Sequence, residues 1–513
     1  MPNSNINANK QLAINIIAQL VAFSIQIGIS FFLTPFIVKS LGAEAYGFVG
    51  LANNIISYTT LITIALNSMA GRFITICVHQ NNIDKANIYF SSVFFSNLLI
   101  SFFLFTISII LIYFLEVCIN IPINLIGDVK ALFGLLLLNS IIGLITNVYA
   151  ISTFICNRLE LNSIRTIIGN ISRAAILIFL FSLFTPHVWY LGLSALAYTV
   201  YVGLFNFKYT QKLTPDLKLS INKYNKRAVK ELISAGTWNL LSKLSDILSQ
   251  GFDLLLANLF IGATAMGVLS ITKTIPMVIL SVFALLASCF APEWTELYAK
   301  KQINKLKDEL LKSIRILGIF SSIPLAILYA YGDVFYHLWI PSEDSRLLYL
   351  LTIASTIGMT CGLPQESLWN IFTITNQVRK SSLNLLYNSI LIILIVIIGI
   401  NYVESDIAKL FILASTRTIV GLIRVLTFLP IYGAKCLNLK PTIFYRPIIM
   451  NVFSILILSI LSFLVKEIFL ENTWTSLCIS ILITCIIGLI VNSYLILTPT
   501  DREFICNKIK SKL

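Results

Sequence analysis

Long apolar stretches alternate with short polar segments along this chain of 513 residues. Six stretches contain no Asp, Glu, Lys or Arg: residues 11–38, 86–115, 131–157, 381–403, 447–465 and 472–500. Each is long enough to cross the hydrocarbon core of a bilayer as a helix, which takes about 20 apolar residues. In lipid the backbone must satisfy its own hydrogen bonds, and these stretches are too long and too uniformly apolar for barrel strands. The pattern therefore predicts an all-α integral membrane protein.

We predict about fourteen transmembrane helices from this pattern. They cover residues 12–38, 46–78, 87–115, 131–156, 162–185, 188–207, 232–260, 266–298, 314–331, 347–375, 382–402, 407–432, 447–465 and 473–497. An even number of spans places both termini on the same side of the membrane. The first apolar run is too long for a signal-peptide core and lacks a small-residue cleavage site, so we expect an uncleaved first span.

The composition supports the membrane assignment and narrows the class of protein. Charged residues make up 12% of the chain, against about 25% in soluble domains, and the mean hydropathy is +0.87. The sequence contains no phosphate-binding loop, no dinucleotide fingerprint and no nucleophile elbow. Its three histidines lie far apart and its nine cysteines form no CxxC pair. We therefore expect no ATP-driven pump, no metal or other cofactor and no enzyme.

The distribution of basic residues predicts the orientation of the chain. With the N-terminus in the cytoplasm, the predicted cytoplasmic segments hold 26 Lys and Arg residues and the external segments hold five. This asymmetry follows the positive-inside rule, so both termini are predicted to be cytoplasmic. The net charge of +14 then reflects topology and attraction to anionic lipid headgroups, and no nucleic-acid partner is expected.

Two similar segments indicate an internal repeat. Residues 41–47 (LGAEAYG) and 261–267 (IGATAMG) lie 220 residues apart, and each follows the first span of its half. The cytoplasmic turns 154–157 (FICN) and 372–376 (FTITN) recur at nearly the same offset. Gly and Ala also simply allow a tight external hairpin, so the recurrence is the informative part.

The repeat predicts two parallel six-helix lobes and a further helix pair. The predicted parts are residues 1–215 (N-lobe, spans 1–6), 216–440 (C-lobe, spans 7–12) and 441–513 (spans 13–14 and a cytoplasmic tail). Parallel repeats imply a pseudo-two-fold axis along the membrane normal and a central cavity, which suits alternating access.

Span seven carries a polar stripe on an otherwise apolar helix. Asn239, Lys243, Asp246, Gln250 and Asp253 fall within an arc of about 80° at 100° per residue. We interpret the stripe as cavity lining. A buried structural network, with Lys243 and Asp246 as an ion pair, is the alternative.

Charges inside the predicted spans indicate the substrate. Each costs about 2.5–3.5 kcal/mol at mid-membrane on insertion scales, so each is expected to face a protein interior or a wet cavity. The deep basic residues are Arg72, Arg173, Lys243, Lys273, Arg417 and Arg424, and the deep acidic residues are Asp246, Asp253 and Glu366. This cationic balance favours an anion, notably phosphate. The three acidic residues are ion-coupling candidates, and Glu366 follows Pro364 in a predicted break of span ten.

Residues 32–47 (FLTPFIVKSLGAEAYG) and 251–267 (GFDLLLANLFIGATAMG) resemble the corresponding segments of polysaccharide flippases of the O-antigen type. These belong to the multidrug/oligosaccharidyl-lipid/polysaccharide exporter superfamily. The resemblance implies two lobes like those of multidrug-and-toxin-extrusion transporters, followed by two C-terminal helices. It also implies that basic cavity residues bind an anionic lipid-linked sugar in the cytoplasmic (inner) membrane of a bacterium.

The resulting hypothesis is a flippase for an undecaprenyl-diphosphate-linked oligosaccharide, an O-antigen or capsule repeat unit of surface polysaccharide or lipopolysaccharide. Membrane lipids, a polysaccharide polymerase and a chain-length regulator are the further expected partners. The alternatives are a proton- or sodium-coupled drug/cation antiporter and a lipid II flippase. A glycan polymerase or ligase would need a large external loop, and the longest predicted external loops, 116–130 and 332–346, are too short.

Overall fold

The computed structural model describes residues 8–497 and residue 502, except for the side chains at positions 8–13, 16, 62, 249, 250 and 292. This part of the chain consists of helices joined by short turns and contains no strand, which confirms the predicted all-α class. Its contacts divide it into two compact units, Met1–Gly267 and Val268–Leu513. The predicted lobe boundary at residues 215/216 stays a prediction.

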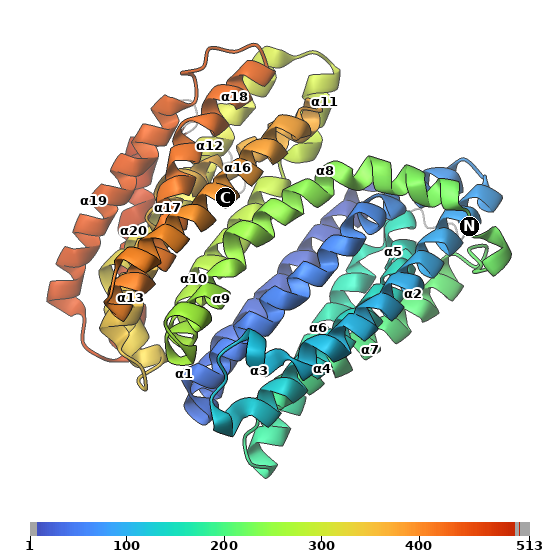
Figure 1. Cartoon of the computed structure of the whole chain (residues 1–513). Coiled ribbons are helices and arrows are strands. Elements are labelled where there is room, and N and C mark those ends of the chain that lie inside the picture. Colours follow the sequence, from blue (N-terminus) through green and yellow to red (C-terminus); the bar gives the residue numbers. More distant parts are fainter. Residues whose placement is uncertain (1–7, 498–501, 503–513) are drawn as a thin grey trace. The chain divides into compact units, whose positions relative to one another are not determined.

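The first unit is built around the long helix α1. Its elements are α1 (Ala8–His79), α2 (Ile83–Tyr113), α3 (Leu115–Cys118), η1 (Ile123–Leu125), α4 (Ile126–Thr146), η2 (Asn147–Ala150), α5 (Ile151–Ile155), α6 (Leu159–Leu183), α7 (Trp189–Leu213), η3 (Ile221–Lys223), α8 (Lys226–Gln250), α9 (Phe252–Phe260) and the start of α10 (Ala263–Ser288). Helices α2, α6 and α8 pack against α1, and α4 packs against α7 (Figure 1).

Helix α1 consists of two arms that meet at Gly42. Gly42 has φ 85° and ψ 160°, which is outside the helical region. Thr34 Oγ1 lies 3.5 Å from Tyr46 Oη, although twelve residues of straight helix would span about 18 Å. The chain therefore reverses at Gly42, where the sequence predicts the turn between the first two spans.

In the second unit, the helices pack around α12. The elements that follow α10 are α11 (Ala291–Ala299), α12 (Ile303–Trp339), α13 (Ser345–Thr356), α14 (Met359–Gly362), η4 (Leu363–Leu368), α15 (Trp369–Ile374), α16 (Val378–Tyr402), α17 (Asp406–Leu426), α18 (Phe428–Cys436), α19 (Tyr445–Phe469) and α20 (Trp474–Leu495). Helices α13, α19 and α20 contact α12. Asn492 of α20 donates to Ser322 Oγ at 2.8 Å, so the final helix pair is bound to α12 by polar contacts.

Eleven helices of the described chain are long and apolar enough to cross a membrane, and twelve if one bent pair is a single span. The chain is therefore a multi-pass membrane protein. The total is compatible with fourteen spans, since α1 has two arms and α8 with α9 is long but too polar to be counted. The bent pair turns by 41° after Thr356, and Pro364 opens the 3-10 segment η4, in agreement with the predicted break of span ten.

Helix α12 is longer than its predicted span, which starts at residue 314. It begins at Ile303, and its first part is amphipathic: Leu306, Leu310 and Ile314 are buried at four-residue spacing. The charged residues between them end the apolar run but do not end the helix.

The internal repeat is also visible in the backbone conformation of the two halves. Left-handed residues recur at offsets of 219 or 220: Gly42 with Gly262, Asn81 with Lys301, and Asn157 with Asn376. These positions end helices or form turns, and φ agrees within 2° for Asn81 and Lys301 and for Asn157 and Asn376, while Gly42 and Gly262 share only a positive φ. This supports the two parallel repeats predicted from the sequence.

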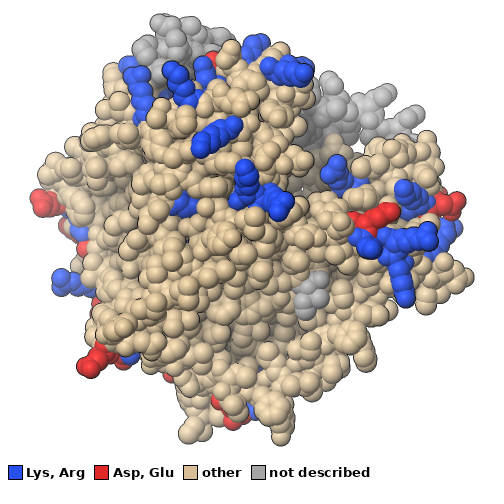
Figure 2. Space-filling view, turned by 45° about the horizontal axis from the view of Figure 1, so that its top comes forward, with Lys and Arg blue, Asp and Glu red and all other residues tan. Residues whose placement is uncertain are grey.

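The outer surface is apolar over wide areas. Large side chains such as Phe102 (68% exposed) and Leu482 (63% exposed) face outwards. On the face drawn in Figure 2, Lys and Arg side chains lie in the upper part and along the two sides, while a wide area below the centre carries none. Such a surface fits a lipid environment with charged segments at the membrane boundary.

Candidate anion-binding pocket

A cavity of about 190 Å³ lies within the first unit, among α1, α4, α6 and α7. Its lining combines one cation, two amides, two hydroxyl groups and an apolar wall. The lining residues are Val49, Asn53, Leu136, Asn139, Arg173, Leu191, Ala195, Tyr198 and Thr199.

Helical spacing brings these residues to one place. Val49 and Asn53 are one turn apart on α1, and Leu136 and Asn139 are three apart on α4. On α7, Leu191, Ala195 and Tyr198 follow the same three- and four-residue spacing. Residues at such intervals share a helix face, so α1 and α4 each present one apolar and one polar side chain side by side.

Three glycines allow the helices around the cavity to approach closely. A Cβ on Gly169 of α6 would lie 2.7 Å from the Tyr198 ring. Cβ atoms on Gly192 and Gly203 of α7 would lie 2.9 Å from Leu135 and 2.8 Å from Thr146 of α4. Arg173 follows Gly169 by one helical turn, so the same face of α6 carries the close contact with Tyr198 and the guanidinium group.

Arg173 is the charged group of the pocket. Its side chain is half-buried, and it forms no ion pair or hydrogen bond with another residue of the described chain. Asn139 Oδ1 is also buried and accepts no hydrogen bond from that part of the chain. An Arg side chain carries five N–H donors and a permanent charge. The pocket therefore presents unused donors and one unused acceptor.

The pocket lies near the middle of the helices that form it. Asn53 is eleven residues from the turn at Gly42, which corresponds to about 16 Å of helix. Arg173 is ten residues from Leu183, at the end of α6, or about 15 Å. Half of a hydrocarbon core about 30 Å thick is a similar distance. These distances would place Arg173 near the middle of a bilayer that α6 spans.

The other predicted site residues of the first unit lie outside this pocket. Arg72 and Lys243 have exposed side chains, whereas Asn239 and Asp246 are half-exposed. The side chain of Gln250 lies outside the described residues. Asp253 is in the first turn of α9, where its carboxylate accepts from the Leu254 N–H at 2.9 Å. A carboxylate suits that position because helix N-termini attract negative charge.

The remaining predicted residues belong to the second unit. Lys273, Arg417 and Glu366 are half-buried in α10, α17 and η4. The Arg424 guanidinium carbon lies 4.8 Å from the centre of the Trp369 ring, a cation–π arrangement near the end of α17.

Four polar residues of the pocket are not among the predicted site residues: Asn53, Asn139, Tyr198 and Thr199. Asn139 lies in a charge-free stretch, and Tyr198 and Thr199 are ordinary residues of an aromatic-rich span. The sequence feature that could have indicated the pocket is the pair Gly169 and Arg173. The two residues lie one helical turn apart, so one face of α6 carries both a small residue that allows close packing and a charge.

Solved structures of membrane transporters share this fold. The chain matches the lipid II flippase MurJ in an inward closed conformation with a TM-score of 0.64 and 16% identity, covering 93% of this chain and 97% of that one. It matches an inward-facing multidrug resistance transporter of the MATE family and MOP superfamily with a TM-score of 0.63 and 15% identity, covering 82% and 98%. The chain therefore has the same fold as these two membrane proteins.

Sequence comparison identifies the family. A model described as polysaccharide biosynthesis protein matches residues 37–336, more than half of the chain. The chain therefore belongs to this family of polysaccharide biosynthesis proteins, as the resemblance in its sequence indicates. It is also 28% identical over 508 residues, 98% of each chain, to EpsK of Bacillus subtilis (strain 168), described as an uncharacterized membrane protein.

Proposed function

We propose that this chain is a flippase that moves an undecaprenyl-diphosphate-linked oligosaccharide across the bacterial cytoplasmic membrane by alternating access. The observation that carries the proposal is Arg173, a half-buried cation at mid-membrane depth without a carboxylate partner among the described residues. An isolated charge at that depth is costly. An anionic substrate that enters the pocket would offset the cost, whereas a cationic drug would increase it.

The other deep charges have roles in this proposal. Arg72, Lys243, Lys273, Arg417 and Arg424 attract the diphosphate and the anionic groups of the glycan as the head group passes. Asp246, Asp253 and Glu366 couple the cycle to a proton or sodium gradient by changing charge. Asn239 and Gln250 line the path of the head group.

The cellular setting follows from the same proposal. Both termini lie in the cytoplasm, and an N-terminal and a C-terminal body rock about the substrate. The polyprenyl tail stays in lipid. A polysaccharide polymerase and a chain-length regulator act on the repeat unit, of O-antigen or capsule, after it reaches the outer leaflet.

A lipid II flippase is the second candidate. The match to the lipid II flippase covers 93% of this chain. Lipid II carries the same kind of anionic polyprenyl diphosphate. Essentiality of the gene with arrested cell-wall synthesis would favour this candidate, whereas a viable deletion that lacks surface polysaccharide would exclude it.

The test is a gene deletion in the host, with surface polysaccharide and membrane-bound lipid-linked oligosaccharide measured together. We expect loss of surface glycan and accumulation of the complete lipid-linked unit. Wild type and the exposed control Arg346→Ala should restore export, and Arg173→Ala should not. Unchanged glycan with greater sensitivity to cationic dyes would refute the flippase and favour the drug/cation antiporter.

A further inference from the structure

We infer that the Arg173 pocket accepts one acidic sugar residue of the transported glycan, and this inference rests on the proposed function. The first argument is size. A volume of about 190 Å³ corresponds to roughly six water molecules at about 30 Å³ each. Drug-sized ligand pockets measure about 300–1,000 Å³. The pocket is therefore of a size that suits one sugar ring rather than a whole oligosaccharide.

The second argument is the chemistry of the lining. Arg173 supplies the charge that a carboxylate matches in a bidentate manner. Asn139 Oδ1 is a buried acceptor that needs a donor, which a sugar hydroxyl provides and a fully ionised phosphate does not. Val49, Leu136 and Leu191 form an apolar wall beside these polar groups. A pyranose ring with polar edges and apolar C–H faces matches such a lining, and its acid group pairs with the guanidinium.

The test is ligand binding to the full-length protein in lipid nanodiscs, by isothermal titration calorimetry with glucuronate, glucose and inorganic phosphate as probes. We expect glucuronate to bind and glucose to bind at least tenfold more weakly. Arg173→Ala should abolish glucuronate binding, and Asn139→Leu should weaken it about five- to tenfold, the worth of one hydrogen bond. Asn401→Leu, at an exposed side chain of α16, is the control and should bind as wild type does.

Two outcomes would overturn the inference: equal binding of glucuronate and glucose, or binding of phosphate alone. Gel filtration of each variant shows whether it folds. If Arg173→Ala does not fold, Asn139→Leu, which keeps the charge, carries the test. Failure here leaves the export assay in cells unaffected, so the two proposals are tested separately.

A second inference follows from a different set of contacts. Helices α8 and α9 follow the connection between the predicted lobes, yet they are bound to the first unit along their whole length. At the start of α8, Tyr89 Oη of α2 donates to Glu231 Oε2 at 2.6 Å. Near its end, Asn54 of α1 donates to the Gly251 carbonyl at 3.1 Å. Between these points, Gly236 packs against the backbone of Ala65 so closely that a Cβ would overlap it.

The connection before α8 is itself fixed to α2. Asn87, which is buried, donates to the Asp216 carbonyl at 3.0 Å and accepts from the Lys218 N–H at 2.7 Å. The hydroxyls of the buried Ser91 and Ser92 accept from the backbone N–H groups of Ser220 and Asn225. Because the backbone of this connection is hydrogen-bonded to α2 at several points, we do not expect it to act as a hinge.

The end of α9 is held as firmly. Asn258, which is fully buried, accepts from the Asn120 N–H at 2.8 Å and donates to the Asn120 carbonyl at 3.0 Å. The Asn120 side chain donates to the Asn258 carbonyl at 3.0 Å. We infer that α8 and α9 move together with the first unit, and that the joint between the moving bodies lies after Gly267 and not in the connection 208–230.

Cross-linking tests this inference. In a background with all nine cysteines replaced, Asn120→Cys and Asn258→Cys are joined by a short cleavable bis-thiol reagent, and export is measured in the deletion strain. We expect the cross-linked protein to support export as well as the reduced form does. Loss of export that returns on cleavage would show that α9 leaves the first unit, and would overturn the inference. If this pair fails to fold, Ser92→Cys with Asn225→Cys repeats the test at the other end.

Discussion

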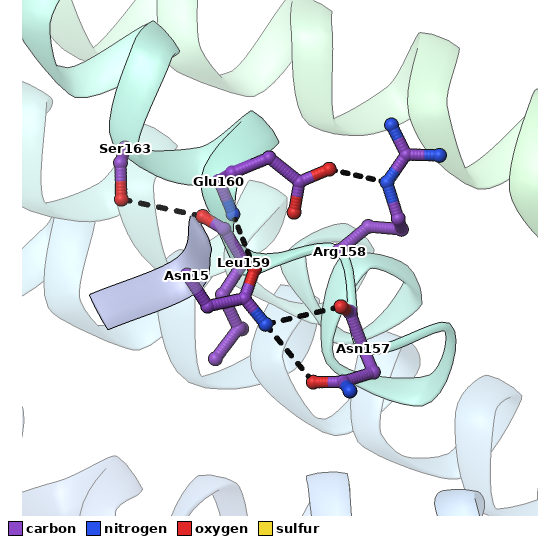
Figure 3. Close-up of polar contacts among 6 residues, drawn as sticks. All are labelled: Asn15, Asn157, Arg158, Leu159, Glu160 and Ser163. Carbon is purple, nitrogen blue, oxygen red and sulfur yellow. Dashed lines mark hydrogen bonds and ion pairs between the residues drawn. The ribbon is translucent and has the colours of Figure 1, made fainter. Parts of the chain in front are cut away.

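Asn157 and Asn376, 219 residues apart, adopt the same left-handed backbone conformation, with φ of 53° and 55°. In both turns the next residue donates its N–H to the carbonyl five positions earlier, Arg158 to Thr153 and Gln377 to Phe372. This is the bonding pattern of a helix that ends on a left-handed residue. Only Asn157 has a further role: Asn15 of α1 donates to both its carbonyl and its Oδ1, at 3.1 and 3.0 Å (Figure 3).

This difference predicts unequal effects of the same substitution. Asn376→Gly should leave the thermal unfolding midpoint unchanged or slightly raised, because glycine adopts positive φ without strain. Asn157→Gly should lower it modestly through loss of the bond from Asn15. Asn157→Val should destabilise the protein by about 1–2 kcal/mol or more, because a β-branched residue is strained there. Fluorescence-detected gel filtration after heating measures all three. Equal effects of glycine at both positions would contradict the role of Asn15.

Close helix packing gives the second prediction. A Cβ on Gly236 of α8 would overlap the Ala65 carbonyl of α1, whereas a Cβ on Gly28 of α1 would meet no atom within 4 Å. Gly236→Ala should therefore destabilise the protein by about 1–3 kcal/mol, the usual cost of overpacking. Gly28→Ala is the matched control and should be neutral or stabilising by up to about 1 kcal/mol, since alanine favours a helix. A normal midpoint for Gly236→Ala would show that α8 moves away from α1 without cost.

These positions illustrate how far the sequence predicts the fold. Charge-free stretches located the spans to within a few residues, because in lipid apolar length determines where a helix can lie. The start of α12 was missed, since an amphipathic helix continues into water. The break between α8 and α9 at Gly251 was also missed. It depends on tertiary contacts with Tyr58 and Asn54, which no local pattern records.

The candidate site, like the fold, could be predicted from the sequence only in part. Depth and charge could be predicted for Arg173 from its place in span five. The other residues of the pocket could not be predicted, because Asn139 and Tyr198 come to line the same cavity only through the close packing of α7 on α4 and α6. The deep cations of the sequence therefore indicate an anionic substrate, but the sequence does not show which of these cations line the same pocket. Of the seven predicted residues in the first unit, only Arg173 lines this cavity.

The third prediction concerns pH. Burial raises the pKa of the Glu343 carboxyl, in the turn between α12 and α13. The folded state therefore binds the proton of Glu343 more tightly than the unfolded state does. The free energy of unfolding falls as the pH rises from below the ordinary pKa of a glutamate, about 4.3, to above the raised pKa of Glu343. Glu343→Gln should stabilise the protein at neutral pH and have little effect below about pH 4. Unfolding midpoints between pH 4 and 8 test this, with Glu404→Gln as the exposed control. If Glu343→Gln stabilised the protein equally at every pH, ionisation of Glu343 would not be the cause of the effect.

The fourth prediction concerns the attachment of the final helix pair. Asn492 of α20 is fully buried, donates to Ser322 Oγ of α12 and accepts from the Ser454 hydroxyl of α19, so one side chain joins three helices. Asn492→Leu removes both bonds and leaves two buried hydroxyl groups without this partner. Hydrogen bonds between membrane helices contribute about 0.6–1.7 kcal/mol each. We therefore expect a loss of about 1–2 kcal/mol and faster amide exchange in α19 and α20.

Hydrogen-exchange mass spectrometry in detergent separates this effect from a general loss of stability. Asn401→Leu removes an exposed amide that bonds only to the Ile397 carbonyl of its own helix, and should leave exchange unchanged. If Asn492→Leu increases exchange in α19 and α20 before other helices, the final pair is a separately attached element that Asn492 helps to hold against α12. Uniformly increased exchange would mean that these helices unfold together with the rest of the second unit. Asn492 would then stabilise the unit as a whole and would not hold α19 and α20 in particular.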